Sequence, residues 1–542
     1  MTIVARGWCV RLLATTALAL VVGMMLISGG CYAQPTDLSP NQQVIVGRTI
    51  CEYPPGMVLR PYIINLDGPT AICFDSEGTL FVAEGGGTAG NWQPHIFGFR
   101  PHAPPGERFF DIYPTHVPFL YPLIKPSYQI YGPIGGMVAY NGKLYVTHKD
   151  ASGNGVVTEF GYDGSHRVVV ADIPARGDYG MGDIAVDETG RLYFSVGSAT
   201  NSGVVGPDNW QIGWPRQYPD FCDVPFQPLK LTGYRFNSNN PLAGLFSGSP
   251  LAVTAPFQPY NTSDRLEIFG GARNRCTSAI YSISPSGGDL KVEAWGVRYA
   301  RGIVCGEFRR IFFSDDGMEL RGTRPVKNDP DSVLQLFSRG ITGTWYGFPD
   351  YTSNLQPVGQ EQYQPGPEYL RDTGYPENAA VVDEANSHLS APDPSNMLRG
   401  TFPTQSGAAK MTLVPSAGPA AGFFSAYRGG ILVALSGDRT PFSMGDGGLK
   451  LRDHPGFKVV RLDLSTHEVT DFVYNTQGGP ASALGLSGQA LERPIDVKFG
   501  PDGALYILDY GYMTMKDGKE DVAEGTGKIW RLMPESFDVN SN

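Results

Sequence analysis

Helical periodicity and basic charge are both scarce in this 542-residue sequence. Very few stretches repeat apolar residues at helical spacing, which disfavours a helical fold. Acidic residues number 53 against 42 basic ones, and the formal net charge is −11. Domains that bind nucleic acid carry clustered positive charge, so no nucleic-acid partner is predicted. An acidic surface suits a soluble protein that binds cations or neutral sugars.

Metal-binding cysteine motifs are absent as well. None of the seven cysteines forms a Cys-x-x-Cys or Cys-x-x-Cys-His motif, so neither a zinc ribbon nor a covalently attached haem is expected. Those after residue 33 are Cys51, Cys73, Cys222, Cys276 and Cys305. An oxidising compartment permits disulfides among them, but their odd number leaves at least one thiol unpaired in a monomer. Their spacing selects no pairing.

A long apolar run occurs only near the start of the chain. Arg6 and Arg11 precede the run at residues 12–27, and small residues follow it, which is the layout of a secretory signal peptide. The run is short for a membrane span of roughly 20 residues. Cleavage is predicted after Ala33, with lipoprotein processing at Cys31 as the alternative. The mature protein is therefore expected to be periplasmic or secreted, without a membrane span.

Turn-forming residues are abundant, with 69 glycines and 44 prolines, and they frame short alternating strands. A turn of Asp, Asn or Gly followed by a strand that often contains Leu-Tyr recurs six times. The copies lie at residues 74–84, 140–148, 186–195, 306–314, 427–434 and 499–508. Such repetition is typical of a propeller, whose radial closure protects the edges of small antiparallel sheets. The sequence therefore predicts an all-β fold, a six-bladed β-propeller.

The unequal spacing of the copies predicts long loop insertions at about residues 200–265 and 350–410, both rich in Pro, Gly, Asn and Ser. A last strand at residues 527–532 could pair with one near residues 48–51 and close the ring. Residues 34–542 would then form a single propeller domain. Two stacked sandwiches are the alternative, which the regular copies disfavour.

Residues 314–331 form a loop that is dense in Asp, Gly and Arg, and Arg298 and Arg301 precede it. Asp side chains and backbone carbonyls are hard oxygen donors suited to Ca²⁺, whereas arginine forks suit carboxylates or phosphates. The loop is therefore predicted to hold a cation and an anion side by side. The simpler alternative is a solvated loop whose opposite charges pair with each other.

Several segments, in order, resemble the glucose/sorbosone dehydrogenase family, soluble six-bladed propellers that oxidise sugars with pyrroloquinoline quinone (PQQ) and calcium. Residues 296–303 (GVRYARGI) are similar to the family's Gly-x-Arg-Asn-Pro-x-Gly segment, and residues 316–326 to the loop after it. Residues 344–350 (TWYGFPD) are similar to its Tyr-Gly-Trp-Pro segment. Residues 196–206 and 493–503 also fit the sorbosone dehydrogenase branch. The likeness covers most of the chain.

The resemblance implies a role for several residues. By position, the cofactor site would include Arg298, Arg301, Asp316 and Arg493. Arg298 would contact the quinone and Arg493 one of its carboxylates, while Gly317 and Met318 would offer consecutive backbone carbonyls to Ca²⁺. Guanidinium forks would hold the planar polyacid, and the cation would polarise the quinone carbonyl. The arginines could otherwise bridge neighbouring blades through buried carboxylates.

Departures from the family affect proton transfer most. The family's general base is a His that would remove the proton of the sugar hydroxyl, and Tyr179 stands in its place. An unperturbed Tyr has a pKa of about 10 and is a poor base at neutral pH. Ser436 and Ile495 replace a Lys and an Arg of the glucose-type enzymes, and Tyr299 replaces an Asn. These changes weaken the predicted quinone site without disturbing the signals for the fold.

Two other residues could manage the proton. His148 ends the second repeated strand and could face the axial funnel, although His at such positions is more often an ordinary hydrogen-bonded group. Asp183 follows Tyr179 closely and could supply a carboxylate, with capping of a turn as its alternative role. Tyr179, Asp183 and His148 are thus the predicted catalytic candidates.

The leading hypothesis is an exported quinoprotein dehydrogenase that passes a hydride from an aldose or a sorbosone-like sugar aldehyde to PQQ. Ca²⁺ would act as Lewis acid, and a separate electron acceptor would take the electrons from the reduced quinone. The replacement at Tyr179 favours a rival hypothesis, a catalytically impaired propeller that binds carbohydrate or protein. A third hypothesis is a calcium-dependent hydrolase such as a lactonase, which needs side-chain carboxylates that converge on one metal.

Overall fold

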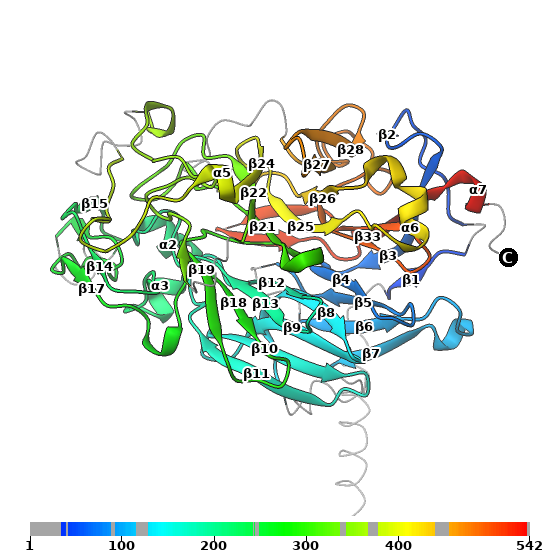
Figure 1. Cartoon of the computed structure of the whole chain (residues 1–542), viewed down its shortest axis with the longest axis horizontal. Coiled ribbons are helices and arrows are strands. Elements are labelled where there is room, and N and C mark those ends of the chain that lie inside the picture. The colour runs from blue at the N-terminus through cyan, green and yellow to red at the C-terminus, as the bar shows by residue number, and fades with distance from the viewer. Residues whose placement is uncertain are drawn as a thin grey trace, which may run out of the picture.

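Antiparallel β-strands make up most of the regular secondary structure in the described residues (Figure 1). The computed structural model describes residues 34–39, 42–87, 93–114, 128–241, 243, 249–336, 343–366, 378–439, 455–516 and 518–538. The predicted signal peptide, residues 1–33, lies outside them. In the described part of the chain, no helix combines the length and the apolar character that crossing a membrane requires.

Six sheets of at least four strands follow one another along the chain. The first blade contains β4 (Ala71–Phe74), β5 (Leu80–Glu84), β6 (His95–Phe99) and β7 (Phe109–Tyr113), and the second β8 (Tyr131–Tyr140), β9 (Lys143–Lys149), β10 (Gly155–Gly161) and β11 (His166–Ile173). The third contains β12 (Met181–Val186), β13 (Leu192–Val196), β18 (Ala279–Ile283), β19 (Lys291–Trp295) and β23 (Thr344–Trp345), and the fourth β20 (Ile303–Cys305), β21 (Ile311–Asp315), β22 (Asp331–Gln335) and β24 (Leu398–Phe402). The fifth contains β25 (Ala408–Leu413), β26 (Gly430–Leu435), β27 (Lys458–Asp463) and β28 (Val469–Asn475), and the sixth β29 (Pro494–Phe499), β30 (Leu505–Asp509) and β33 (Gly527–Pro534).

The first strands of the blades form a closed ring. Each contacts the first strand of the next blade, from β4 through β8, β12, β20, β25 and β29, and β29 returns to β4. This arrangement confirms the predicted six-bladed propeller. It also brings the first strands together around one axis.

Two strands from the N-terminal region complete the last two blades. β3 (Met57–Leu66) pairs antiparallel with β33, with Leu59 opposite Leu532, and β1 (Thr36–Asp37) extends that sheet. β2 (Cys51–Glu52) pairs instead with β28. The predicted final strand is therefore present, but the partner predicted near residues 48–51 is wrong. A two-residue strand offers few ladder bonds, whereas the ten-residue β3 spans the whole of β33.

The six sequence repeats coincide with the turn into the second strand of each blade and with that strand. The second strands β5, β13, β21, β26 and β30 are buried along their whole length, because neighbouring blades cover both faces. The residue types in these turns suit the backbone conformations that the turns require. Asn141 (φ 49) and Gly142 (φ 69) adopt the left-handed conformation that a tight hairpin turn between β8 and β9 requires.

Hydrogen bonds of small hydroxyl side chains join neighbouring blades. In three blades, a Ser or Thr of the second strand donates to a backbone carbonyl at or near the first strand of the next blade. The pairs are Thr147 Oγ1 to Gly182 O at 2.6 Å, Ser195 Oγ to Ala300 O at 2.6 Å, and Ser314 Oγ to Ala409 O at 3.0 Å. These bonds satisfy carbonyls that the blade's own ladder leaves free.

Long segments interrupt the third and fourth blades. The segment between β13 and β18 contains α2 (Pro207–Ile212), α3 (Trp214–Gln217), β14 (Leu229–Lys230), β15 (Phe236–Asn239), β16 (Leu251–Thr254) and β17 (Glu267–Ile268). The segment between β22 and β24 contains β23 and α5 (Pro394–Met397). The two segments meet at a bridge between Leu231 and Val382. Outside the blades lie α6 (Gly418–Phe423), the hairpin of β31 (Met513–Lys516) and β32 (Lys519–Val522), and α7 (Glu535–Asp538).

Candidate functional site

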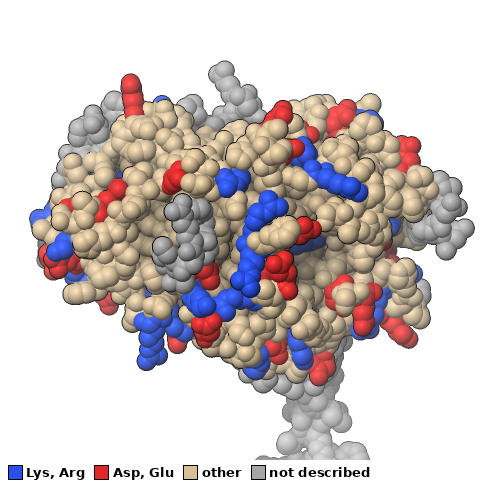
Figure 2. All heavy atoms as spheres, in the orientation of Figure 1, with Lys and Arg blue, Asp and Glu red and all other residues tan. Residues whose placement is uncertain are grey.

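A cavity of about 130 Å³ lies on the propeller axis. Residues at or near the first strands of all six blades line it, together with the β31–β32 hairpin. Its charged and polar lining residues are Thr70, Tyr299, Arg301, Lys410, Ser436, Arg439, Arg493, Tyr510 and Glu520. Figure 2 shows Lys and Arg side chains near the middle of one face of the molecule, with Asp and Glu side chains beside them.

Basic groups outnumber acidic ones around this axial cavity. Its lining includes three arginines and one lysine but a single carboxylate, Glu520, among the described residues. Asp316 lies behind the lining, with Oδ2 at 3.8 Å from Arg301 Nη1 and 3.7 Å from Arg439 Nη2. Arg439 Nε lies 3.4 Å from Glu520 Oε1. The cavity therefore has a net positive charge and favours an anionic ligand.

Two of the cations hydrogen bond to neutral acceptors. Lys410 Nζ donates to Thr70 O at 2.9 Å, and Arg493 Nη1 donates to the carbonyls of Ser436 at 3.1 Å and Asp438 at 2.8 Å. Burial lowers the pKa of both Lys410 and Arg493. Among the described residues, the buried Arg493 Nε and Thr70 Oγ1 have no hydrogen-bond partner. Anionic oxygens in the cavity would supply what these groups lack.

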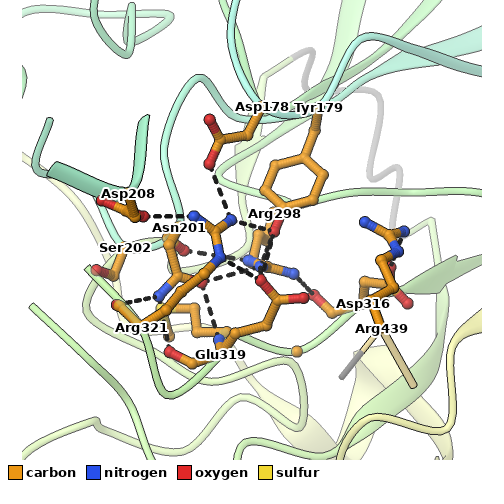
Figure 3. Close-up of polar contacts among 12 residues, drawn as sticks. Asp178, Tyr179, Asn201, Ser202, Asp208, Arg298, Asp316, Glu319, Arg321 and Arg439 are labelled. Carbon is orange, nitrogen blue, oxygen red and sulfur yellow. Dashed lines mark hydrogen bonds and ion pairs between the residues drawn. The ribbon is translucent and has the colours of Figure 1, made fainter. Parts of the chain in front are cut away.

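Arg298 lies apart from the axial cavity, in a buried network around Tyr179 (Figure 3). Its Nε donates to Asn201 O at 3.1 Å and its Nη1 to Asp316 O at 3.2 Å. Its Nη2 donates to Asn201 Oδ1 at 2.9 Å and to the Tyr179 hydroxyl, and lies 3.3 Å from Glu319 Oε2. The guanidinium is only 3% exposed. Protein groups thus satisfy Arg298, which leaves it little capacity for a cofactor.

Arg321 completes this network from the other side of the Tyr179 hydroxyl. It donates to that hydroxyl at 2.9 Å, to Asp178 Oδ2 at 2.8 Å and to Glu319 Oε2 at 2.5 Å, and it also pairs with Asp208. The Tyr179 hydroxyl itself donates to Glu319 Oε2 at 3.1 Å. The loop at residues 314–331 is therefore held to the third blade by buried ion pairs, and it is not the solvated loop of the simpler interpretation.

Tyr179 is held in its protonated form. Burial raises the pKa of its phenol, and the nearby Arg298 and Arg321 lower it by less, so the pKa lies above the ordinary value. The lowered pKa that a catalytic phenolate needs is therefore not present. The geometry gives Tyr179 a supporting role, as a hydrogen-bonding centre between two arginines.

The other two predicted catalytic residues also lie outside the cavity lining. His148 is fully buried, and its ring contacts Lys149 O at 2.8 Å, Thr158 Oγ1 at 2.9 Å and Tyr128 OH at 3.1 Å. Burial lowers the pKa of His148 to about 4. Asp183 Oδ2 accepts from Ile303 N at 3.0 Å and so joins β12 to β20, and burial raises its pKa.

The backbone at Gly317 and Met318 is fixed by two aspartates. Gly317 N donates to Asp331 Oδ1 at 2.9 Å, and Met318 N donates to Asp329 Oδ2 at 2.7 Å. Their carbonyl oxygens accept no hydrogen bond from the described residues, so both carbonyls could bind a cation. Across the described ranges, no group of three or more His, Cys, Asp or Glu residues has a metal-binding arrangement. The hydrolase hypothesis, which needs converging carboxylates, gains no support.

Of the predicted cofactor residues, the structure brings Arg301 and Arg493 together at the axial cavity, with Asp316 behind them. Lys410, Arg439 and Glu520 were not predicted. Lys410 and Ser436 line the same cavity, so a lysine is present although position 436 carries a serine. Arg439 and Ile495 also line this cavity, so an arginine is present although position 495 carries an isoleucine. The signal that could have identified Lys410 and Arg439 is a charged residue in the first strand of a blade or just after its second strand.

No family model and no curated protein matches the sequence. Among solved structures, the holo form of the pyranose dehydrogenase PQQ domain from Coprinopsis cinerea is similar, with 13% identity over 90% of this chain and 98% of that chain and a TM-score of 0.49. A calcium structure of a Trichoderma reesei carbohydrate-active enzyme of family AA12 has 12% identity over 90% of this chain and 98% of that chain, with a TM-score of 0.48. A glucose dehydrogenase has 13% identity over 87% of this chain and 98% of that chain, with a TM-score of 0.45.

Proposed function

We propose that the protein is an exported oxidoreductase that oxidises an aldose or a related sugar aldehyde with PQQ bound in the axial cavity. The observation that carries this proposal is the convergence of Arg301, Lys410, Arg439 and Arg493 on that cavity. PQQ is a planar polyacid, and guanidinium forks and an ammonium group suit its carboxylates. When bound, the quinone would supply the hydride acceptor and calcium the Lewis acid.

The residues present fit such a cofactor in two respects. Arg493 Nε and Thr70 Oγ1 are buried without a partner among the described residues, so a ligand with several oxygens would satisfy them. Gly317 and Met318 have carbonyls that accept no hydrogen bond from the described residues, the donor type that the family resemblance assigns to calcium, although neither residue is among the described lining of the axial cavity. Arg298 is the exception, because its donors are already used within the protein.

The test is to add PQQ and CaCl₂ to the purified apo-protein and to record the absorbance spectrum, followed by dye reduction with a panel of aldoses. The proposal predicts a saturable spectral change and turnover of at least one aldose. A protein that shows neither contradicts it. A matched pair of variants locates the site: Lys410→Met should weaken binding about tenfold or more, because it removes one charged hydrogen bond. Arg167→Met, at an exposed ion pair with Glu159, should leave binding within about twofold.

A second candidate function is a carbohydrate- or protein-binding propeller that has lost turnover. It is favoured by Tyr179, whose pKa burial raises, at the position of the family's base, and by a described cavity lining that includes neither His148 nor Asp183. Calorimetry separates the two. Sugar binding that is indifferent to PQQ and unaccompanied by dye reduction supports the binding protein, whereas sugar turnover that requires PQQ excludes it.

A further inference from the structure

The axial cavity contains one described side-chain carboxylate, that of Glu520, and a carboxylate is a group type that serves as a general base. Arginines cannot lose their proton there, and burial raises the pKa of the phenols of Tyr299 and Tyr510. Lys410 donates to Thr70 O, and a polyanion beside it would keep the amine protonated. No histidine is among the described lining residues.

Glu520 is held at the cavity by a hairpin packed over it. β31 and β32 pair along four residues, and Glu520 lies in β32 opposite Met515. Gly87 (φ +98) faces the Glu520 carbonyl so closely that a Cβ there would lie 3.3 Å from it. A side chain at position 87 would therefore push the hairpin away from the first blade.

The Glu520 carboxylate is oriented from two sides. Tyr510 OH donates to Oε2 at 3.1 Å, and Arg439 Nε lies 3.4 Å from Oε1. The charged and titratable groups that act on it include Tyr299, Arg439, Arg493 and Tyr510. The side chain remains 21% exposed, so a hydroxyl that enters the cavity from solvent can reach it. The other catalytic candidates lack this combination of a fixed position and access.

Resting on the proposed function, we propose that Glu520 is the catalytic base of the sugar oxidation. The carboxylate takes the proton of the hydroxyl on the carbon being oxidised. The C–H electron pair of that carbon leaves as hydride for the quinone, and the C–O bond becomes a carbonyl. Protonated Glu520 then returns its proton to solvent through the cavity mouth. The role of the family's histidine thus passes from the third blade to a hairpin of the sixth.

The experiment compares Glu520→Gln with Glu524→Gln, an exposed carboxylate in the loop after the same hairpin. Glutamine keeps the size of the side chain and the hydrogen bond from Tyr510 but cannot take a proton. Glu520→Gln should bind PQQ at least as tightly as the wild type by absorbance titration, because it removes a negative charge from a basic cavity, while kcat falls about 10²–10⁴-fold. Glu524→Gln should stay within about twofold of the wild type in both measurements.

Each other outcome counts against the inference. If the wild type binds no PQQ, the proposed function fails and the inference fails with it. If Glu520→Gln binds PQQ and retains the wild-type kcat, only the inference fails. If Glu520→Gln folds with an unchanged Tm but no longer binds PQQ, Glu520 serves binding, not proton transfer, and the inference is again overturned.

Discussion

Tyr179→Phe tests whether the network around Tyr179 supports the structure or performs the chemistry. The substitution removes one hydroxyl that accepts from Arg298 and Arg321 and donates to Glu319 at 3.1 Å. Arg298 Nη2 keeps its bond to Asn201 Oδ1, and Arg321 Nη2 keeps its bond to Asp178. Hydrogen bonds to charged groups contribute about 1.5–3 kcal/mol each, and the retained partners reduce the total, so we expect a loss of about 2–4 kcal/mol.

The assay is denaturant unfolding at pH 7, with Tyr53→Phe as the matched control. The Tyr53 hydroxyl is also buried, but it donates to a neutral acceptor, Val46 O, at 2.8 Å and has Arg48 beside it in place of two arginines and a carboxylate. Its loss should cost about 0.5–1.5 kcal/mol. Tyr179→Phe should also bind PQQ and turn over sugar like the wild type. A Tyr179→Phe protein as stable as the wild type, or one that is stable but inactive, would refute the supporting role.

Three further predictions concern the scaffold. Burial would lower the pKa of His95, but Asp111 at 2.9 Å and Glu84 at 3.1 Å outweigh it and raise the pKa to about 9. Protonated His95 therefore stabilises the fold fully below pH 6.5, and this stabilisation is lost as the pH rises through about 9. The difference in unfolding free energy between the wild type and His95→Gln should shrink from about 2–3 kcal/mol at pH 6 toward zero at pH 10. A difference that does not change with pH would contradict this prediction. The five described cysteines are unpaired, and three of them, Cys51, Cys73 and Cys276, are buried, with the pKa of Cys51 raised by burial to about 11, so Ellman's reagent should label these three only as the protein unfolds; rapid labelling of all five thiols in native protein would contradict their burial. Ser195→Ala should destabilise the protein by about 1 kcal/mol in thermal unfolding, because Ala300 O loses its inter-blade donor; an unchanged Tm would show that this bond contributes nothing.

The blades could be predicted because their signals are local. Each repeat joins a turn to an alternating strand within about ten residues, and a turn such as Asn141–Gly142 allows few conformations. The partner of the final strand could not be predicted in the same way. Pairing of Leu59 with Leu532 joins residues that lie far apart in the sequence, and no local signal names the partner. The strand that pairs, β3, has ten residues, whereas β2 has two.

The site was predictable only in part, because some of its residues lie in local motifs and others are brought together only by the fold. Arg301 and Arg493 occur in motifs, and both line the axial cavity. Lys410 and Glu520 lie in segments without a motif, and only the closure of the ring brings them there. Arg298 matched a motif but lies in the Tyr179 network, because Tyr179, Asn201 and Asp316 supply an acceptor for each of its three nitrogens.

The central claim, that the basic axial cavity is the cofactor site, is tested most directly by titrating PQQ with calcium into the wild type and into Lys410→Met/Arg493→Met. Each substitution removes a cation from the cavity, so affinity should fall about 10²–10⁴-fold in the double variant, with thermal unfolding used to confirm that it is folded at the temperature of the titration. Unchanged affinity in the double variant, or no binding by the wild type, would contradict the account.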